Sequence, residues 1–298
     1  MDSIALACVL VSAVMHATWN ILLKTAGDPL RTATAGMVAA SAVLVPGAAV
    51  GWLAFGRPGI PPEALALGFV SGLAEIAYFV FLAAAYRRGD LSVVSPLARG
   101  SAPVLIVFVG VVVLGERLAP AAALGVVVLI AGLLTVQRPW RLLRVANAAH
   151  RGAAGFALLT GLMIATYTSI DRVGSQLVAP WIYATILWIV GAVGLVGIGW
   201  VRPRVAGGAY AIAPGVAFDL RRAVVGGLLT LAAYLLILFA LSRAEVAIVG
   251  PLRESAVLIT SAYGILRLRE AITRREIGFR LTGSALVLAG AALLAVAG

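Results

Sequence analysis

Charged residues are scarce in this sequence, and their scarcity excludes most water-soluble folds. Only 12% of the 298 residues are Asp, Glu, Lys or Arg, whereas 62% are hydrophobic and the mean hydropathy is +1.06. A soluble domain is roughly half apolar and about a quarter charged. We therefore expect most of the chain to lie in a lipid bilayer.

Cysteine, lysine and histidine are rarer still, and each shortage excludes a class of chemistry. Cys8 is the only cysteine, so no internal disulfide can form. The single lysine, Lys24, follows two leucines instead of a glycine-rich loop, which excludes a Walker A sequence and ATP hydrolysis by this chain. His16 lies in an apolar segment and His150 in a polar connector. The sequence therefore predicts no metal site and no cofactor.

What the chain does have is a series of apolar segments, each close to the roughly 20 residues that a spanning helix needs. The first segment lacks a basic start and a clear cleavage site, so we interpret it as a span and not as a signal peptide. The expected fold is an all-α membrane protein with ten transmembrane helices, over residues 3–23, 32–56, 64–86, 91–114, 118–137, 152–170, 173–201, 223–242, 246–266 and 281–298.

The basic residues gather between the spans. Connectors after the odd-numbered spans hold 17 of the 23 Lys and Arg residues, and those after the even-numbered spans hold 4. The positive-inside rule places the first group in the cytoplasm and both chain ends outside. Aromatic residues do not alternate with these basic residues as a nucleic-acid surface requires, so the net charge of +11 predicts no nucleic-acid partner. The lipid bilayer and a small-molecule substrate are the expected partners of a monomer.

The two halves of the chain resemble each other. Val94-Ser95-Pro96-Leu97 aligns with Val249-Gly250-Pro251-Leu252 at an offset of 155 residues, and Gly72 aligns with Gly227 at the same offset. Glu116 follows Pro96 much as Glu270 follows Pro251. We therefore expect a five-helix repeat over 1–145 and a second over 146–298, which together form one transport unit. An odd number of spans per repeat makes the second copy inverted, a common plan in transporters. Chance similarity between apolar helices is the alternative.

Four ionised side chains interrupt the expected spans: Glu75, Arg99, Arg253 and Glu254. Charges inside a membrane are costly and usually face a partner or a wet cavity. Arg99 and Glu254 each lie eight residues inside their spans, which is about 12 Å deep from opposite faces. We predict that these two residues pair near the middle of the bilayer, with Arg253 and Glu75 close by. A purely structural ion pair is the alternative.

Other residues are candidates for coupling, gating or cavity lining. Pro96 and Pro251 should kink their helices, either as hinges or as fixed bends. His16 and Asn20 lie on one face of the first span, where His16 could shuttle protons or only support helix packing. The deep aromatic residues whose hydroxyl groups need partners are candidates for lining a cavity: Tyr78, Tyr167 and Tyr234.

The segments SAVMHATWNILLKTAG, V-x-P-L, GERL and TYTSIDRVG, together with the repeat, resemble the EamA-type transporters of the drug/metabolite transporter superfamily. The chain looks most similar to the bacterial amino-acid exporters of that group, some of which handle aromatic amino acids. The resemblance implies ten helices around a central cavity, and it implies substrate-binding roles for Trp19, Tyr78, Arg99, Tyr167, Tyr234 and Glu254. Two features differ from relatives: the first span has no carboxylate for proton exchange, and relatives usually keep both termini in the cytoplasm.

The sequence thus predicts a non-enzymatic secondary transporter, multi-pass in the plasma (inner) membrane, that exports amino acids or similar metabolites by alternating access. The alternatives are a hydrophobic-drug exporter, an intramembrane enzyme and a non-transporting scaffold. An enzyme would have His16 as its only candidate base, and the chain has no Asp-rich lipid-phosphate motif.

Overall fold

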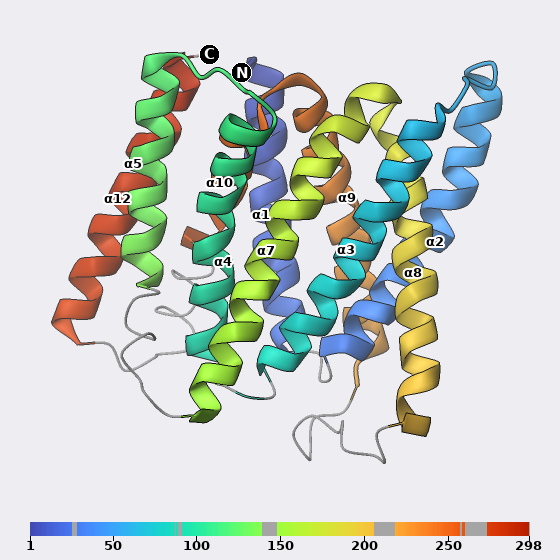
Figure 1. The fold of residues 1–298 in the computed structure, drawn as a ribbon, viewed down its shortest axis with the longest axis horizontal. Coiled ribbons are helices and arrows are strands. Elements are labelled where there is room, and N and C mark those ends of the chain that lie inside the picture. Colours follow the sequence, from blue (N-terminus) through green and yellow to red (C-terminus); the bar gives the residue numbers. More distant parts are fainter. Residues whose placement is uncertain are drawn as a thin grey trace.

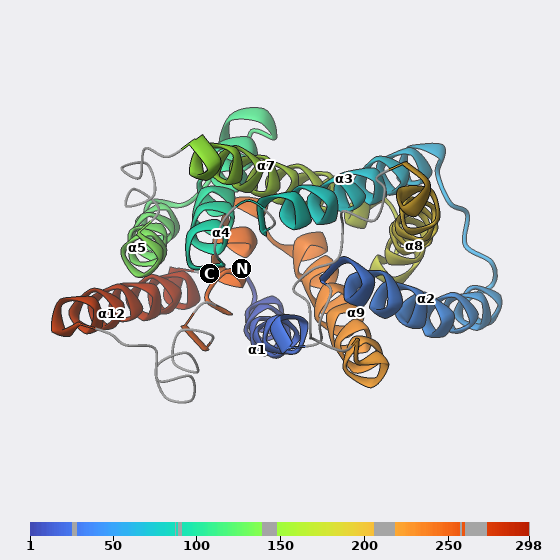
Figure 2. The ribbon, with the colours of Figure 1, turned by 90° about the horizontal axis from the view of Figure 1, so that it is seen from below.

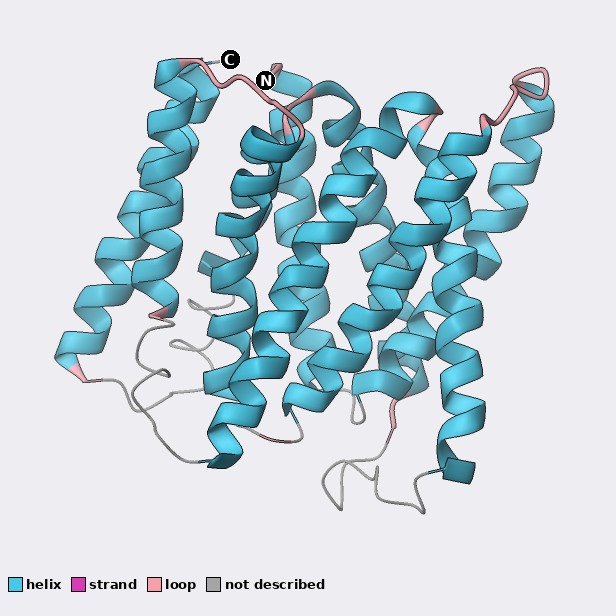
Figure 3. Ribbon diagram, viewed as in Figure 1, coloured by secondary structure: helices cyan, strands magenta, loops and turns pink. Residues whose placement is uncertain are grey.

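The computed structural model describes residues 1–25, 29–86, 88, 91–138, 148–205, 218–256, 258–259 and 273–297. Every regular element in these ranges is a helix (Figure 3). Successive helices run in opposite directions, and both termini lie at the same end of the molecule (Figure 1). We call this the terminal end and the opposite one the distal end.

The observed helices follow the expected spans closely. Seven of the described helices are long and apolar enough to cross a membrane, two more contain shorter apolar stretches, and α10 has only eight residues. The all-helical fold is confirmed, whereas the number of ten spans stays a prediction. The first repeat holds α1 (Ser3–Thr25), α2 (Pro29–Ala54), α3 (Pro62–Tyr86), α4 (Leu91–Phe108) with the π-helix η1 (Val109–Val113), and α5 (Pro120–Gln137). The second holds α7 (Ala148–Leu177), α8 (Pro180–Val205), α9 (Leu220–Arg243), α10 (Val246–Arg253) and α12 (Arg274–Ala297).

Local sequence explains where several helices begin. Proline is the first residue of α2, α3, α5 and α8, where its missing N–H costs no helical hydrogen bond. Asp219 caps α9 by accepting a hydrogen bond of 3.0 Å from the backbone N–H of Arg222. Many large apolar side chains point outward, including Val113, Val193 and Leu281. Such a surface is suited to lipid and not to water.

Many of the contacts between helices show two-fold pseudo-symmetry: exchanging the two repeats converts one observed contact into another. The exchange converts the α1–α9 contact into α7–α3, α2–α9 into α8–α3, and α4–α7 into α10–α1, and the structure contains all six contacts. The α2–α8, α4–α10 and α5–α12 contacts each map onto themselves. Seen along the helices, α1, α2 and α9 lie on one side and α3, α4 and α7 on the other (Figure 2). The repeats therefore interdigitate, and each helix packs largely against the other repeat.

Glycines permit the closest of these contacts. A Cβ atom on Gly227 of α9 would lie 2.1 Å from the carbonyl oxygen of Gly36 on α2. On α5, a Cβ atom on Gly132 would lie 2.6 Å from the backbone nitrogen of Val287 on α12. No side chain fits at such distances, so glycine lets the backbones touch, as is common between membrane helices.

The expected boundary between the sixth and seventh spans is wrong: the seventh was expected to begin at residue 173, whereas α8 begins at Pro180. The sixth span was expected to end at residue 170, with Asp171 and Arg172 in a connector, but α7 continues to Leu177. Asp171 is only 1% exposed. The helix can continue because both charges find partners within the protein.

Candidate functional site

Arg99 of α4 and Glu254, the residue directly after α10, meet as predicted. Arg99 Nη1 lies 3.9 Å from Glu254 Oε2, and the Glu254 side chain is only 6% exposed. α10 ends at Arg253, two residues after Pro251, and the backbone N–H of Glu254 donates to the carbonyl of Pro251 over 3.1 Å. α10 thus ends at the two charged residues, Arg253 and Glu254. The predicted pairing is confirmed, while the role of the pair in substrate binding stays a prediction.

Arg253, the last residue of α10, is buried next to this pair. Its guanidinium carbon lies 5.8 Å from the centre of the Tyr234 ring on α9. This distance permits a cation–π interaction in a site from which water is largely excluded. Arg253 therefore links the charged pair to a group of aromatic side chains.

The three tyrosines predicted from sequence come together from three helices. Tyr78 of α3 and Tyr167 of α7 have ring centres 6.1 Å apart at an angle of 80°. Tyr167 and Tyr234 lie 6.4 Å apart, and Trp188 of α8 lies 6.2 Å from Tyr234. Both repeats contribute to this chain of rings. It brings together the three candidates for cavity lining.

Asp171 is the centre of a buried hydrogen-bond cluster that the sequence reasoning missed. Its Oδ1 accepts hydrogen bonds from Ser71 Oγ over 2.5 Å and from Tyr183 Oη over 3.1 Å. Its Oδ2 accepts one from the hydroxyl of Tyr234. These donors come from α3, α8 and α9, so one carboxylate on α7 joins four helices. The available signal was the spacing of Tyr167 and Asp171, four residues apart on one helical face.

Glu75 of α3 is also buried, but one of its carboxyl oxygens lacks a hydrogen-bond partner in the part of the chain that the structure describes. The residue is only 7% exposed, and its Oε2 has no hydrogen-bond partner among the described residues. It lies within electrostatic reach of Asp171 and Arg253. A carboxylate without a partner in an apolar interior is costly, so this atom marks a place where a ligand or a proton is required.

A small pocket of about 30 Å³ lies beside Glu75. It is as large as one or two water molecules and far smaller than an amino acid. The Trp188 indole nitrogen, also buried, has no partner in the described part of the chain. The pocket is lined by Trp19, Ala33, Gly36, Met37, Glu75, Phe79, Trp188, Gly227 and Thr230.

The remaining predicted residues lie around this centre or outside the described side chains. His16 is half-buried on α1 and within electrostatic reach of Arg99 and Arg253. α4 passes through position 96 as a helix, whereas α10 ends soon after Pro251. The side chains of Asn20 and Pro96 lie outside the described set. The described residues contain no cluster of three or more metal-ligating side chains.

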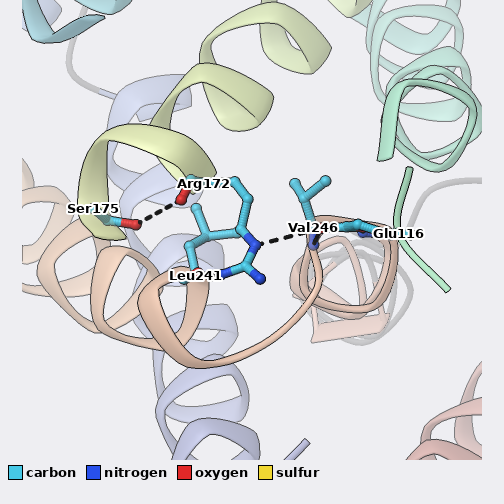
Figure 4. A network of polar contacts seen from close by, with 6 residues as sticks. Glu116, Arg172, Ser175, Leu241 and Val246 are labelled. Atoms are coloured by element: carbon cyan, nitrogen blue, oxygen red, sulfur yellow. Dashed lines mark hydrogen bonds and ion pairs between the residues drawn. The ribbon is translucent and has the colours of Figure 1, made fainter. Parts of the chain in front are cut away.

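A separate polar network joins the repeats at the terminal end (Figure 4). Glu116, in the connector between η1 and α5, accepts hydrogen bonds from the backbone N–H groups of Val246 over 2.8 Å and Ala247 over 3.0 Å. It thereby caps the N-terminus of α10, where a negative charge is favourable. Arg172 pairs with Glu116 Oε1 over 3.3 Å and donates to the carbonyl of Leu241 over 2.5 Å.

A more exposed ion pair lies at the same end. Arg243 Nη2, at the end of α9, is 2.6 Å from Asp2 Oδ2 at the start of α1. Asp2 also accepts a hydrogen bond of 2.7 Å from the backbone N–H of Ala5. These interactions hold the pKa of Asp2 below its usual value of 3.8, first through the bond from Ala5 and then through Arg243. The Asp2–Arg243 pair and the Glu116 network thus both lie at the terminal end and join the two repeats there.

Comparison with known proteins identifies the family. The EamA-like transporter family matches residues 3–137 and again residues 151–296, once for each repeat. The chain therefore belongs to the EamA-like transporter family, a group of the drug/metabolite transporter superfamily, and is a multi-pass membrane protein. A solved structure described as "Crystal structure of protein" has a similar fold, with a TM-score of 0.72, 17% identity, and coverage of 99% of this chain and 98% of that one. The curated proteins include no match.

Proposed function

We propose that this protein is a secondary transporter in the plasma (inner) membrane that exports amino acids or similar zwitterionic metabolites. The supporting observation is that acidic and basic side chains from both repeats meet inside one aromatic, buried centre. Burial of so many charges is unfavourable without a function that uses them. A zwitterion brings one charge of each sign and so matches such a centre.

The acidic and basic groups would each bind the oppositely charged group of the substrate. A buried carboxylate would hold the ammonium group, and Arg99 or Arg253 would hold the carboxylate. Tyr78, Tyr167 and Tyr234 would accept an apolar or aromatic side chain, since their rings form a continuous surface across α3, α7 and α9. Small residues around them leave room when the helices separate.

Transport would proceed by alternating access, in which the centre opens to one side of the membrane at a time. The Glu116 network and the Asp2–Arg243 pair join the repeats at the terminal end, and the pocket of about 30 Å³ is too small for a metabolite. Substrate entry therefore needs helices to move apart at the distal end. Because the repeats interdigitate, the moving units would be groups such as α1–α2–α9 and α3–α7–α8, which exchange under the two-fold.

Flux measurements in proteoliposomes test this proposal. Purified protein should exchange radiolabelled amino acids across the membrane, and a pH gradient applied in either direction will show whether protons are coupled. Competition by zwitterionic amino acids, with none by cationic dyes, supports the proposal. The opposite pattern would identify a hydrophobic-drug exporter, and absence of flux for every compound would contradict a transport function.

A further inference from the structure

Among the described carboxyl groups at the centre, Glu75 has a fully buried oxygen, Oε2, without a hydrogen-bond partner, although the Tyr234 hydroxyl lies near the same carboxyl group. Asp171 accepts three hydroxyl hydrogen bonds, and Glu254 pairs with Arg99. Glu75 Oε2 has none among the residues that the structure describes. A carboxylate whose acceptor sites are filled gains little from a ligand, whereas one left open in an apolar interior gains a full hydrogen bond and a counter-charge.

A donor without a partner lies in the same pocket. Trp188 Nε1 is buried, the residue is 2% exposed, and no described residue accepts its hydrogen. Trp188 and Gly191 lie three residues apart on α8, and a Cβ atom on Gly191 would lie 3.8 Å from Glu75 Oε2. The carboxyl group of α3 therefore faces the side of α8 that bears the indole. The pocket thus offers one open acceptor and one open donor.

We infer that Glu75 and Trp188 form the subsite for the head group of the substrate, an α-amino acid. The Glu75 carboxylate holds the ammonium group, and the Trp188 N–H donates to a carboxylate oxygen on the neighbouring carbon. This inference rests on the proposed transport of amino acids and selects Glu75, not Glu254, as the ammonium-binding acid. The Asp171 cluster positions the subsite, because Tyr234 donates to Asp171 and packs against Trp188.

The size and lining of the pocket agree with the ammonium group alone and not with a whole substrate. An ammonium group is about as large as a water molecule, and a pocket of about 30 Å³ can hold it. Trp19, Phe79 and Trp188 place aromatic rings around it. Aromatic faces attract cations, most strongly when water is excluded. The carboxylate would lie next to the Trp188 N–H, and the body of the substrate would extend towards the tyrosines, as the helices separate.

Chemical protection tests the subsite without relying on transport. N,N′-dicyclohexylcarbodiimide labels protonated carboxyl groups in apolar sites, and mass spectrometry locates the label. The probes are two matched sets: L-alanine, ethylamine and propionate, and L-phenylalanine, 2-phenylethylamine and 3-phenylpropionate. In at least one set the amino acid and the amine should slow labelling of Glu75 while the acid does not. Failure of the amine to protect better than the acid in both sets overturns the inference.

Variants test the two contacts separately in flux measurements. Glu75→Gln should lower uptake of the protecting amino acid at least tenfold, with Glu63→Gln on the exposed start of the same helix as the unchanged control. Trp188→Phe should weaken the apparent affinity for the amino acid about tenfold and the affinity for the amine much less, because only the amino acid has the carboxylate. Trp200→Phe, on the same helix with a residue 71% exposed, is its control.

The outcomes separate this inference from the proposed function. Flux that persists unchanged in Glu75→Gln, with no preferential protection, contradicts the subsite and leaves amino-acid transport intact. Selective protection of Glu75 without any flux contradicts transport and leaves the subsite intact. Equal losses for amine and amino acid in Trp188→Phe contradict the role assigned to the indole N–H.

Discussion

Arg172 Nε lies 3.3 Å from Glu116 Oε1, and this ion pair connects the two repeats at the terminal end. The two side chains are only 16% and 8% exposed, so water screens their attraction weakly. The same carboxylate caps α10, the short helix that ends at the charged centre. Glu116 therefore joins the terminal end to the helix that carries Arg253 and precedes Glu254.

Glu116→Gln should destabilise the protein by about 3 kcal/mol, because it leaves the Arg172 charge without its partner and weakens the cap. Denaturant unfolding of the detergent-solubilised protein measures the change. Glu63→Gln, which removes an exposed carboxylate from the first turn of α3, is the matched control. A loss below about 0.5 kcal/mol, the range of ordinary surface substitutions, would show that the network contributes little.

The cluster around Asp171 predicts a ranking of two variants. Tyr183→Phe removes one of three hydrogen bonds to the carboxylate and should cost about 1–3 kcal/mol. Asp171→Asn weakens all three, and its amide hydrogens would face hydroxyl donors, so it should cost more. Thr135→Val, whose hydroxyl bonds only to its own helix at an exposed site, is the control. Equal effects of Tyr183→Phe and Asp171→Asn would mean that the carboxylate is not the centre of the cluster.

Much of the fold could be predicted from sequence because membrane spans obey simple physical rules. A long apolar segment in lipid must be helical, so the predicted ranges correspond closely to the observed helices. The pairing of Arg99 with Glu254 could also be predicted, since an inverted repeat and a rise of about 1.5 Å per residue place both at similar depth. The inverted repeat, the charges inside the spans and the resemblance to the EamA family together indicated a transporter, and the family match agrees with this.

The Asp171 cluster and the Glu75 pocket could not be predicted in the same way. Asp171 and Arg172 resemble a polar connector, and only the contacts from α3, α8, α9 and the α4–α5 connector explain why the helix continues through them. Which of several buried acids lacks a partner depends on rotamers and neighbours from other helices. Sequence spacing along one helix contains no such information.

The Arg99–Glu254 pair predicts a measurable coupling. Glu254→Gln alone should destabilise the protein by several kcal/mol, since it leaves buried cations with less compensation. Arg99→Gln should cost less, because the Arg99 side chain is 21% exposed and its contact with Glu254 is long, at 3.9 Å. The double variant should be more stable than the sum of the single effects predicts, by about 0.5–3 kcal/mol. Strict additivity in this double-mutant cycle would show that the two charges do not interact.

The contact between Gly36 and Gly227 predicts the effect of a single methyl group. Gly227→Ala would place its Cβ atom 2.1 Å from the carbonyl oxygen of Gly36, so α2 and α9 must separate. We expect a loss of stability of about 1–3 kcal/mol or more, together with reduced transport, because Gly227 also lines the pocket. Gly47→Ala, on α2 with no atom within 4 Å of its Cβ position, should be neutral or slightly stabilising. Similar stability of the two variants would contradict the close helix contact.

The Asp2–Arg243 pair predicts how stability depends on pH at the terminal end. The folded state holds the pKa of Asp2 below its usual value of 3.8, so the ionised carboxylate stabilises the fold at all higher pH values. This contribution should be lost as the pH falls through the lowered folded pKa. The unfolding free energies of the natural protein and Asp2→Asn should therefore differ by a constant amount from pH 5 to 7 and converge once the pH falls below the lowered pKa of folded Asp2. Both side chains are more than one-third exposed, so raising the salt concentration should shrink the difference. A difference that persists in acid would mean that Asp2 acts through something other than its charge.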